Sequence, residues 1–140
     1  MIVVLDTTFF VLHYFSRDKR ILDTTREVLK DSRKLGHRGI VPTIVLAEFY
    51  ALTHKRAGRE VAEIYFTEMV RSGLTMAPLS TEISRQAAIL RAKYQERIPW
   101  GDCIIAATAI VSGSQMLVTE DPHFDRLTEV TPRRTINIRS

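Results

Sequence analysis

A carboxylate follows the first apolar segment of the chain, at a position where it could take part in chemistry. Residues 2–5 (Ile-Val-Val-Leu) have the pattern of a strand that is buried on both faces, and Asp6 comes directly after it. Because ligands of open α/β sheets bind at the carboxyl ends of the strands, Asp6 is a candidate functional residue. The structural alternative is a helix cap, in which Asp6 or Thr8 satisfies the free N–H groups of a helix that begins near Phe9.

Two further acids, Glu48 and Asp102, fall on helix faces that are otherwise apolar. Their neighbours at three and four residues along the chain are Ile44, Val45, Ala51 and Leu52 for Glu48, and Ile98, Pro99, Ile105 and Ala106 for Asp102. A buried carboxylate destabilises a fold by several kcal/mol unless it is protonated, paired or bound to a cation. The structural alternatives are a buried ion pair with an arginine for Glu48 and favourable charge in the first turn of a helix for Asp102.

These acids can converge at one place with a fourth, Asp121. Asp6 and Asp121 follow strands, Asp102 opens a helix and Glu48 lies about one turn inside another, although Asp-Pro after a strand is also a common turn element. Four converging carboxylates would repel one another, and a hard divalent cation with oxygen ligands is the usual way to offset that repulsion. The scattered histidines and the single cysteine make no zinc motif, and His123 alone, near Asp121, could support the site from outside the ligand set.

Alternating strands and helices must position these acids. Strands are expected at 2–5, 39–41, 74–77 and 116–118, with an edge strand at 135–138, and helices at 9–15, 20–35, 43–56, 60–71, 81–97 and 102–111. In the helix at 20–35 the inward residues are expected to be Ile21, Val28, Leu29 and Leu35. The alternation predicts a parallel α/β sheet covered by helices on both faces.

Length and composition favour one domain, residues 1–140, with 45% hydrophobic residues. The lone Cys103 cannot form an internal disulfide and is expected to be a small buried hydrophobe in a protein of the reducing cytoplasm. The chain begins directly with a strand, without a signal peptide, and it has no apolar run of membrane-spanning length. Its net charge of +4 is a weak indication of a polyanionic partner, which becomes stronger if four of the 16 acids bind metal.

Four segments, spread over nearly the whole chain, together resemble a PIN domain, and more narrowly a VapC-type toxin of a toxin–antitoxin pair. They are Leu5-Asp6-Thr7-Thr8, Pro42-Thr43 with Leu46-Ala47-Glu48, residues 102–109 (Asp-Cys-Ile-Ile-Ala-Ala-Thr-Ala) and residues 118–124 (Val-Thr-Glu-Asp-Pro-His-Phe). The sequence departs from the family pattern at Thr8, where Ser or Asn is common, and at Glu120, where Asn, Arg or Asp is often found. Glu120 is either a fifth acid near the metals or a solvated turn residue, and we favour the second.

The resemblance implies a three-layer α/β/α sandwich on a parallel sheet of four to five strands. It implies Mg²⁺ or Mn²⁺ held by Asp6, Glu48, Asp102 and Asp121, and hydrogen bonds within the site from Thr119 and Thr8. The implied activity is hydrolysis of RNA phosphodiester bonds, for which we expect Asp6 and Asp102 to be the least dispensable residues. The implied partners are a second copy of the chain and a VapB-type antitoxin whose arginine or tail occludes the acidic pocket. Trp100 and Tyr65 could contribute to these contacts, but core packing is the role expected for both.

Other classes of protein fit the residues less well. A haloacid-dehalogenase-type phosphatase would need a second aspartate where Thr8 stands, and a phosphoacceptor receiver domain would need a lysine later than Lys93, which is the last in the chain. A non-catalytic PIN fold that binds RNA or protein should have lost an acid, and none is lost. A PIN nuclease of RNA processing stays open beside the toxin, and an antitoxin encoded immediately upstream would discriminate between them.

Overall fold

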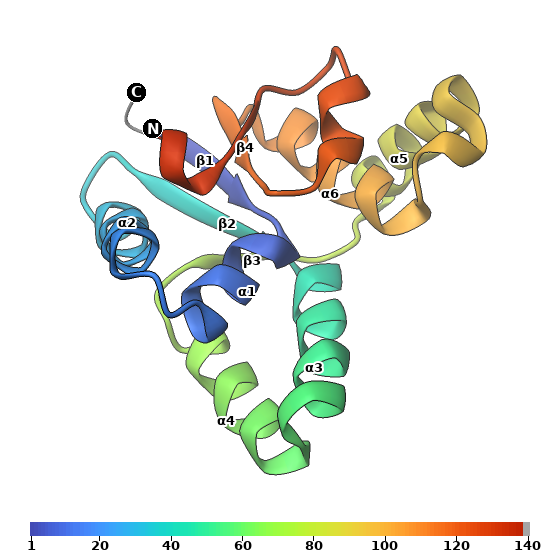
Figure 1. Ribbon diagram of the computed structural model, residues 1–140. Helices are drawn as coiled ribbons and strands as arrows, with labels where there is room; N and C mark the ends of the chain where they lie inside the picture. The colour runs from blue at the N-terminus through green and yellow to red at the C-terminus, as the bar shows by residue number, and fades with distance from the viewer. Residues whose placement is uncertain (139–140) are drawn as a thin grey trace.

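A five-stranded parallel sheet forms the centre of the computed structural model, which describes residues 1–138. The strand order is β3-β2-β1-β4-β5, and every neighbouring pair is parallel. The strands are β1 (Ile2–Leu5), β2 (Arg38–Pro42), β3 (Thr75–Ala77), β4 (Met116–Val118) and β5 (Pro132–Arg133). Because the first strand of the chain lies in the middle, its carboxyl end is flanked by the ends of β2 and β4 (Figure 1).

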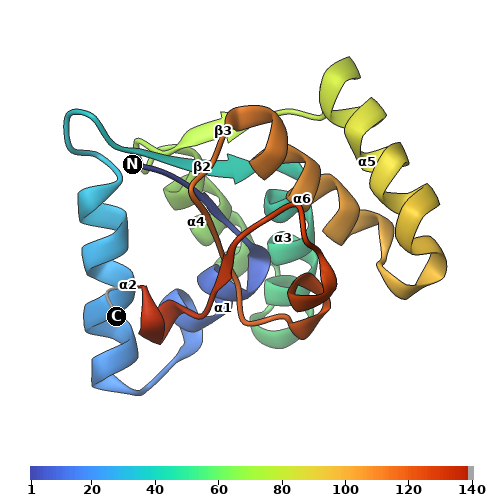
Figure 2. The ribbon, with the colours of Figure 1, turned by 90° about the horizontal axis from the view of Figure 1, so that it is seen from above.

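Helices cover both faces of this sheet. They are α1 (Thr7–Phe15), α2 (Lys19–Asp31), α3 (Thr43–Ala57), α4 (Arg59–Val70), α5 (Thr81–Tyr94) and α6 (Trp100–Ser112), with short 3₁₀ turns η1 (Gln95–Arg97), η2 (Pro122–Arg126) and η3 (Thr135–Asn137). Helices α1 to α4 lie on one side of the sheet, and α5 and α6 lie on the other (Figures 1 and 2). Right-handed crossovers require this, since the chain moves outward from β1 to β3 and then returns across the sheet to β4. The three-layer α/β/α fold expected from the sequence is confirmed.

Small side chains bring α6 close to the sheet. Ala106 and Ala107 are fully buried and Ala109 nearly so, which allows the helix backbone to lie near β1. The helix ends at Gly113, whose left-handed backbone (φ 67°) favours glycine. Helix α6 is therefore seated firmly on the core, and its first turn, which carries Asp102, is held beside the carboxyl ends of β1 and β4.

The core contains aromatic side chains from both ends of the chain, with Phe9, Phe10, Phe49 and Phe124 almost completely buried. Tyr65 stacks on Tyr14 with 4.2 Å between ring centroids, so its expected packing role is confirmed. Cys103 is fully buried, as expected, and burial raises the pKa of its thiol. The same expectation is wrong for Trp100, which is 52% exposed at the start of α6.

Two further expectations are wrong at chain reversals. The edge strand is β5, and the expected strand at 135–138 is instead the turn η3. The N–H groups of Leu117 and Thr119 donate to Thr131 O and Arg133 O beside it. Leu35 is fully exposed because α2 ends at Asp31 and the chain then turns back towards β2. Helix α5 also ends earlier than expected, at Tyr94, and η1 continues from it.

Within residues 1–138, no helix combines the length and apolar character needed to cross a bilayer.

Candidate active site

Asp6 lies at the middle of the carboxyl edge of the sheet and is 3% exposed. Asp6 occupies the N-cap position of α1, but its side chain makes no capping hydrogen bond to that helix. Its Oδ2 instead accepts hydrogen bonds from the hydroxyls of Thr119 at 2.7 Å and Thr8 at 2.8 Å. Burial raises the pKa of Asp6, and these two hydrogen bonds lower it in part. Asp6 is thus oriented from two sides by neutral donors, with no cation as partner among them.

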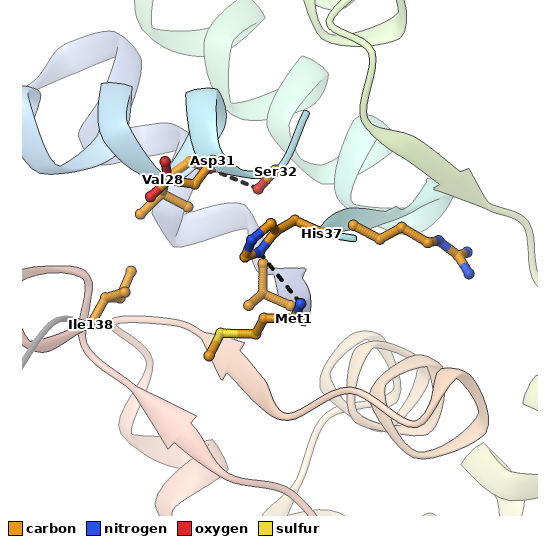
Figure 3. Close-up of a pocket in the computed structure, with 8 residues that line it drawn as sticks. Met1, Val28, Asp31, Ser32, His37 and Ile138 are labelled. Carbon is orange, nitrogen blue, oxygen red and sulfur yellow. Dashed lines mark hydrogen bonds between the residues drawn. The ribbon is translucent and has the colours of Figure 1, made fainter. Parts of the chain in front are cut away.

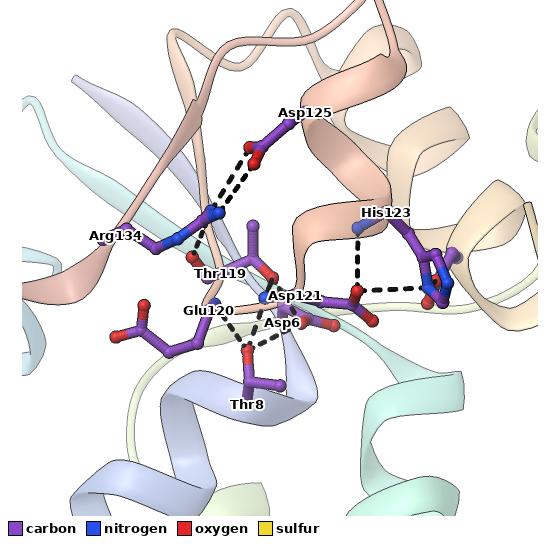
Figure 4. A network of polar contacts seen from close by, with 9 residues as sticks. Asp6, Thr8, Thr119, Glu120, Asp121, His123, Asp125 and Arg134 are labelled. Atoms are coloured by element: carbon purple, nitrogen blue, oxygen red, sulfur yellow. Dashed lines mark hydrogen bonds and ion pairs between the residues drawn. The ribbon is translucent and has the colours of Figure 1, made fainter.

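The two threonines join the end of β4 to the end of β1 (Figure 4). Besides donating to Asp6, the Thr119 hydroxyl accepts from the Asp121 N–H at 2.9 Å, and the Thr8 hydroxyl accepts from the Glu120 N–H at 2.9 Å. Each hydroxyl therefore acts as donor and acceptor at once. This arrangement fixes both the Asp6 carboxylate and the backbone that carries Asp121.

Glu48 reaches the same edge from α3. Its Oε1 accepts a hydrogen bond from the Thr7 hydroxyl at 2.8 Å, a contact that the sequence did not indicate. Burial raises the pKa of Glu48, Thr7 lowers it, and the charges of Asp6 and Asp121 raise it further, as they do when carboxylates face a common space. Among the described residues no arginine forms an ion pair with Glu48, so the buried-ion-pair alternative does not hold.

The expected apolar stripe around Glu48 is only half present. Ala51 and Leu52, one turn further along α3, are exposed, whereas Val45 on the preceding turn is fully buried. Glu48 lies where the helix emerges from the core, and it is partly accessible. Gly101 marks how closely α6 approaches it, since a Cβ added there would lie 2.8 Å from Glu48 Oε2.

Asp102, Asp121 and His123 form the other half of the cluster. The His123 Nδ1 lies 3.1 Å from both Asp102 Oδ2 and Asp121 Oδ1, and ligand atoms of all three residues lie within 4.8 Å of one another. Burial raises the pKa of Asp102 to about 7, aided by the charges of Asp121 and Asp6 and opposed by His123. Asp102 is 8% exposed, so it is a buried acid in an acidic neighbourhood.

Glu120 points away from this cluster (Figure 4). Its Oε1 accepts a hydrogen bond from the Thr135 N–H at 3.3 Å, while the nearby Arg134 pairs with Asp125 at 2.7 Å. The geometry therefore matches the interpretation of Glu120 as a turn residue, here one that anchors the segment after β5, and does not make it a fifth acid of the cluster.

A separate hollow of about 230 Å³ lies at the opposite edge of the sheet, where β1 and β2 begin (Figure 3). Val3, Val28 and Ile138 supply part of its mainly apolar lining, and the ammonium group of Met1 donates to Gly36 O at 2.8 Å beside it. It holds one carboxylate, Asp31, and therefore lacks the convergence of acids found at the carboxyl edge. The acidic cluster is the stronger candidate for chemistry.

The carboxylates of Asp6, Glu48, Asp102 and Asp121 come from the ends of β1 and β4 and from α3 and α6, and they are near enough for their charges to act on one another. Among the described residues, the group whose ligand atoms all lie within 4.8 Å of one another is Asp102, Asp121 and His123, without Asp6 or Glu48. Burial and mutual repulsion disfavour their simultaneous ionisation, as the raised pKa values of Asp6, Glu48 and Asp102 express. Oxygen ligands of this kind match the preference of Mg²⁺ and Mn²⁺, and a cation would offset the repulsion. The residues present therefore fit a divalent metal centre.

Valine has nearly the shape of threonine but lacks its hydroxyl. Replacing Thr119 by valine is therefore expected to destabilise the fold by about 1–3 kcal/mol, because the buried Asp6 carboxylate loses a donor and the Asp121 N–H loses an acceptor. Thr119→Ser keeps the hydroxyl and should retain most of the stability. Chemical denaturation of the two variants against wild type measures the difference. Wild-type stability of Thr119→Val would show that the hydroxyl contributes nothing here.

Replacing Gly101 by alanine is expected to displace the Glu48 carboxylate, because the new Cβ would lie 2.8 Å from Oε2. A carboxylate at the end of a flexible side chain can move aside, so the thermal midpoint should change little while the affinity for Mn²⁺ falls by about tenfold or more. Calorimetric titration of Mn²⁺ into both proteins measures this. Gly113→Ala is unsuitable as a control because of its positive φ, whereas Ala88→Ser on the exposed face of α5 should leave metal affinity unchanged.

The protein has a parallel α/β/α fold with acidic side chains gathered at the carboxyl ends of its strands. The chain belongs to the PIN domain family, whose family model matches residues 3–130. Comparison with curated proteins gave no significant match.

Several solved structures of similar fold are VapBC complexes, and another is a VapC toxin. The VapBC2 complex of Rickettsia felis, bound to a promoter DNA fragment, aligns with a TM-score of 0.75 and 21% identity over 96% of this chain and 98% of that one. The DNA-bound VapBC of Salmonella typhimurium aligns with a TM-score of 0.75 and 20% identity over 96% and 98%. VapC20 of Mycobacterium tuberculosis, a toxin that cleaves the sarcin-ricin loop, gives 0.70 and 20% over 93% and 99%. At these identities the likeness establishes the fold.

Proposed function

We propose that this protein is a metal-dependent endoribonuclease that hydrolyses RNA phosphodiester bonds, and that it is the toxin of a type II toxin–antitoxin pair. The observation that carries the proposal is the convergence of Asp6, Glu48, Asp102 and Asp121 at the carboxyl edge of the sheet, two of them buried. Membership of the PIN family and the similarity in fold to VapC toxins support the same activity.

In this proposal the four acids hold one or two Mg²⁺ or Mn²⁺ ions. A bound cation would supply what carboxylates alone lack, activating water as the nucleophile and offsetting negative charge on the phosphoryl oxygens. The chain's own task is to keep the acids ionised and correctly oriented. Thr8 and Thr119 orient Asp6 and Thr7 orients Glu48, because each donates a short hydrogen bond to a carboxylate oxygen.

His123 has a positioning role in the same scheme. With its Nδ1 at 3.1 Å from both Asp102 Oδ2 and Asp121 Oδ1, it links the acid that opens α6 to the acid that follows β4. A proton on Nδ1 would hold the two carboxylates at a fixed separation and offset part of their repulsion. The ring thereby supports the ligand set from beside it.

Partners follow from the same proposal. A VapB-type antitoxin would be expected to occlude the acidic cluster, for which an arginine is the natural complement, and the toxin would act in the cytoplasm as a homodimer. A PIN nuclease of RNA processing would share the chemistry but would have no antitoxin. The structural neighbours that are VapBC complexes favour the toxin.

The experiment that tests the proposal has two parts. Purified protein is incubated with labelled RNA in Mg²⁺, in Mn²⁺ and in excess chelator, and cleavage is expected only when a metal ion is present. Expression in a bacterial host is then followed with and without the product of the neighbouring upstream gene, which should relieve growth arrest. Absence of cleavage in either metal would refute the nuclease, whereas cleavage without toxicity would leave a processing enzyme.

A further inference from the structure

Trp100, the only tryptophan of the chain, stands exposed next to the acidic cluster without a role in it. The guanidinium carbon of Arg91 lies over the indole ring, 5.1 Å from the ring centroid. Arg91 is itself held in place, since its Nη1 donates to Ile98 O at 3.1 Å. We call these two side chains the Trp100–Arg91 pair. The pair thus combines an exposed aromatic ring with a cation that is held over it.

The pair lies beside the proposed reaction centre but outside it. Trp100 opens α6, Gly101 faces Glu48 and Asp102 belongs to the cluster, so three successive residues connect the ring to the acids. Successive side chains of an α-helix are rotated by about 100°, which directs Trp100 roughly opposite to Asp102. Its contact with Arg91 of α5 agrees with that direction. The ring therefore cannot touch a phosphate held at the acids, but it can contact a neighbouring part of the same polymer.

The chemistry of the pair matches a nucleotide. The guanidinium lies over the indole ring, and Trp100 is nevertheless 52% exposed, so about half of its surface is open to a ligand. Nucleic-acid bases stack on aromatic rings, and a nearby arginine attracts the backbone phosphates. Because Arg91 is already hydrogen-bonded to the backbone, little side-chain freedom is lost when a ligand binds. A purely apolar protein contact would gain nothing from the fixed positive charge.

We infer that the Trp100–Arg91 pair binds the RNA beside the phosphate to be cleaved, with a base of that RNA stacked on the indole ring. The inference rests on the proposed ribonuclease activity and adds two residues that bind the substrate outside the acids. A base in a continuous duplex is stacked on both sides and cannot lie on the indole, whereas bases of loops and ends can.

The kinetic test compares Trp100→Ala and Trp100→Phe with wild type on one single-stranded RNA in Mn²⁺. Loss of the ring is expected to raise KM by about 5- to 150-fold, the range that alanine substitution of a stacking residue gives, with little change in kcat. Phenylalanine keeps a stacking face and should restore most of the affinity. The matched control is Ile64→Ala on α4, which removes an apolar side chain of 55% exposure away from α6 and should leave KM unchanged.

A binding test does not depend on cleavage. Because Trp100 is the only tryptophan, its fluorescence reports directly on its ring, and Trp100→Phe supplies the blank. Single-stranded oligoadenylate is titrated into the Asp6→Asn variant in Mg²⁺, and quenching is expected. The same strand paired with oligouridylate should quench far less. Circular dichroism of each variant confirms that the fold is intact.

The outcomes separate this inference from the proposed function. If wild type cleaves RNA but Trp100→Ala has an unchanged KM, or if duplex quenches as well as single strand, the stacking role is wrong and the nuclease stands. If no RNA is cleaved in any metal, the proposed function fails, and quenching by oligoadenylate alone still decides whether the ring binds single strands. If Trp100→Ala instead converts a dimer to a monomer in sedimentation with no effect on RNA, the ring belongs to a contact with a second copy and the inference is overturned.

Discussion

The purified Asp102→Asn variant is expected to lose metal-dependent RNA cleavage while keeping its fold. Substituting groups that merely orient metal ligands typically costs 10- to 100-fold, so removing a ligand carboxylate should lower kcat/KM by more than about 100-fold. Asp102 is buried among acids, and burial raises its pKa to about 7. The amide removes a charge that the metal-free fold tolerates poorly. The variant should therefore be at least as stable as wild type when metal is absent. Asp6→Asn, at the centre of the same cluster, should behave alike.

The measurement is the initial rate of cleavage of a labelled RNA in Mg²⁺ and Mn²⁺, with circular dichroism as the test of folding. Glu120→Gln is the matched control, because Glu120 is adjacent to Asp121 in sequence but points away from the cluster and accepts only from the Thr135 N–H. The amide oxygen of glutamine can accept the same bond, so the rate should be unchanged. Wild-type cleavage by purified Asp102→Asn would remove this acid from the catalytic machinery.

The parts of the fold that sequence predicts well are those fixed by local pattern. Residues 2–5 are apolar and largely β-branched, a pattern typical of a strand buried on both faces, and β1 is the central strand. Asp102 stands out because its neighbours along the helix are apolar, and it is buried as that pattern predicts. An acid that is costly to bury is visible in a sequence because the surrounding residues reveal the burial.

Other features depend on contacts between distant segments and leave no local mark. The Thr7–Glu48 hydrogen bond needs α1 and α3 to meet, and the closeness of Gly101 to Glu48 needs α6 to lie beside α3. The residues next to a threonine or a glycine in the sequence do not indicate which distant residue it will contact. Leu35 illustrates the converse, since its helical spacing suggests burial, but α2 ends at Asp31 and leaves it in solvent. The short edge strand β5 was missed for the same reason, because its two residues are placed by β4.

Metal-free protein is expected to become less stable as the pH rises from about 5 to 8. Burial and neighbouring charges raise the pKa of Asp102 to about 7 in the folded protein, from an ordinary value of 3.8. Between these values the folded state binds more protons than the unfolded state, so the free energy of unfolding falls with increasing pH. Between pH 5 and 8 Asp102 alone would contribute about 3 kcal/mol, or a fall in thermal midpoint on the order of 10 °C. The raised pKa values of Asp6 and Glu48 act in the same direction.

Two comparisons isolate this effect. Burial lowers the pKa of His13, which stabilises the fold as pH rises and opposes the trend, but this contribution cancels in the difference between wild type and Asp102→Asn. The variant should show a flatter dependence of thermal midpoint on pH in chelator. Mg²⁺ or Mn²⁺ should restore wild-type stability at pH 8 and have much less effect at pH 5, where protons compete for the same carboxylates. Scanning calorimetry from pH 5 to 8 measures all of these. Identical pH profiles for wild type and Asp102→Asn would show that the pKa of Asp102 is not raised in the folded protein. An equal Mn²⁺-induced shift of the thermal midpoint in both proteins would show that Asp102 is not a metal ligand.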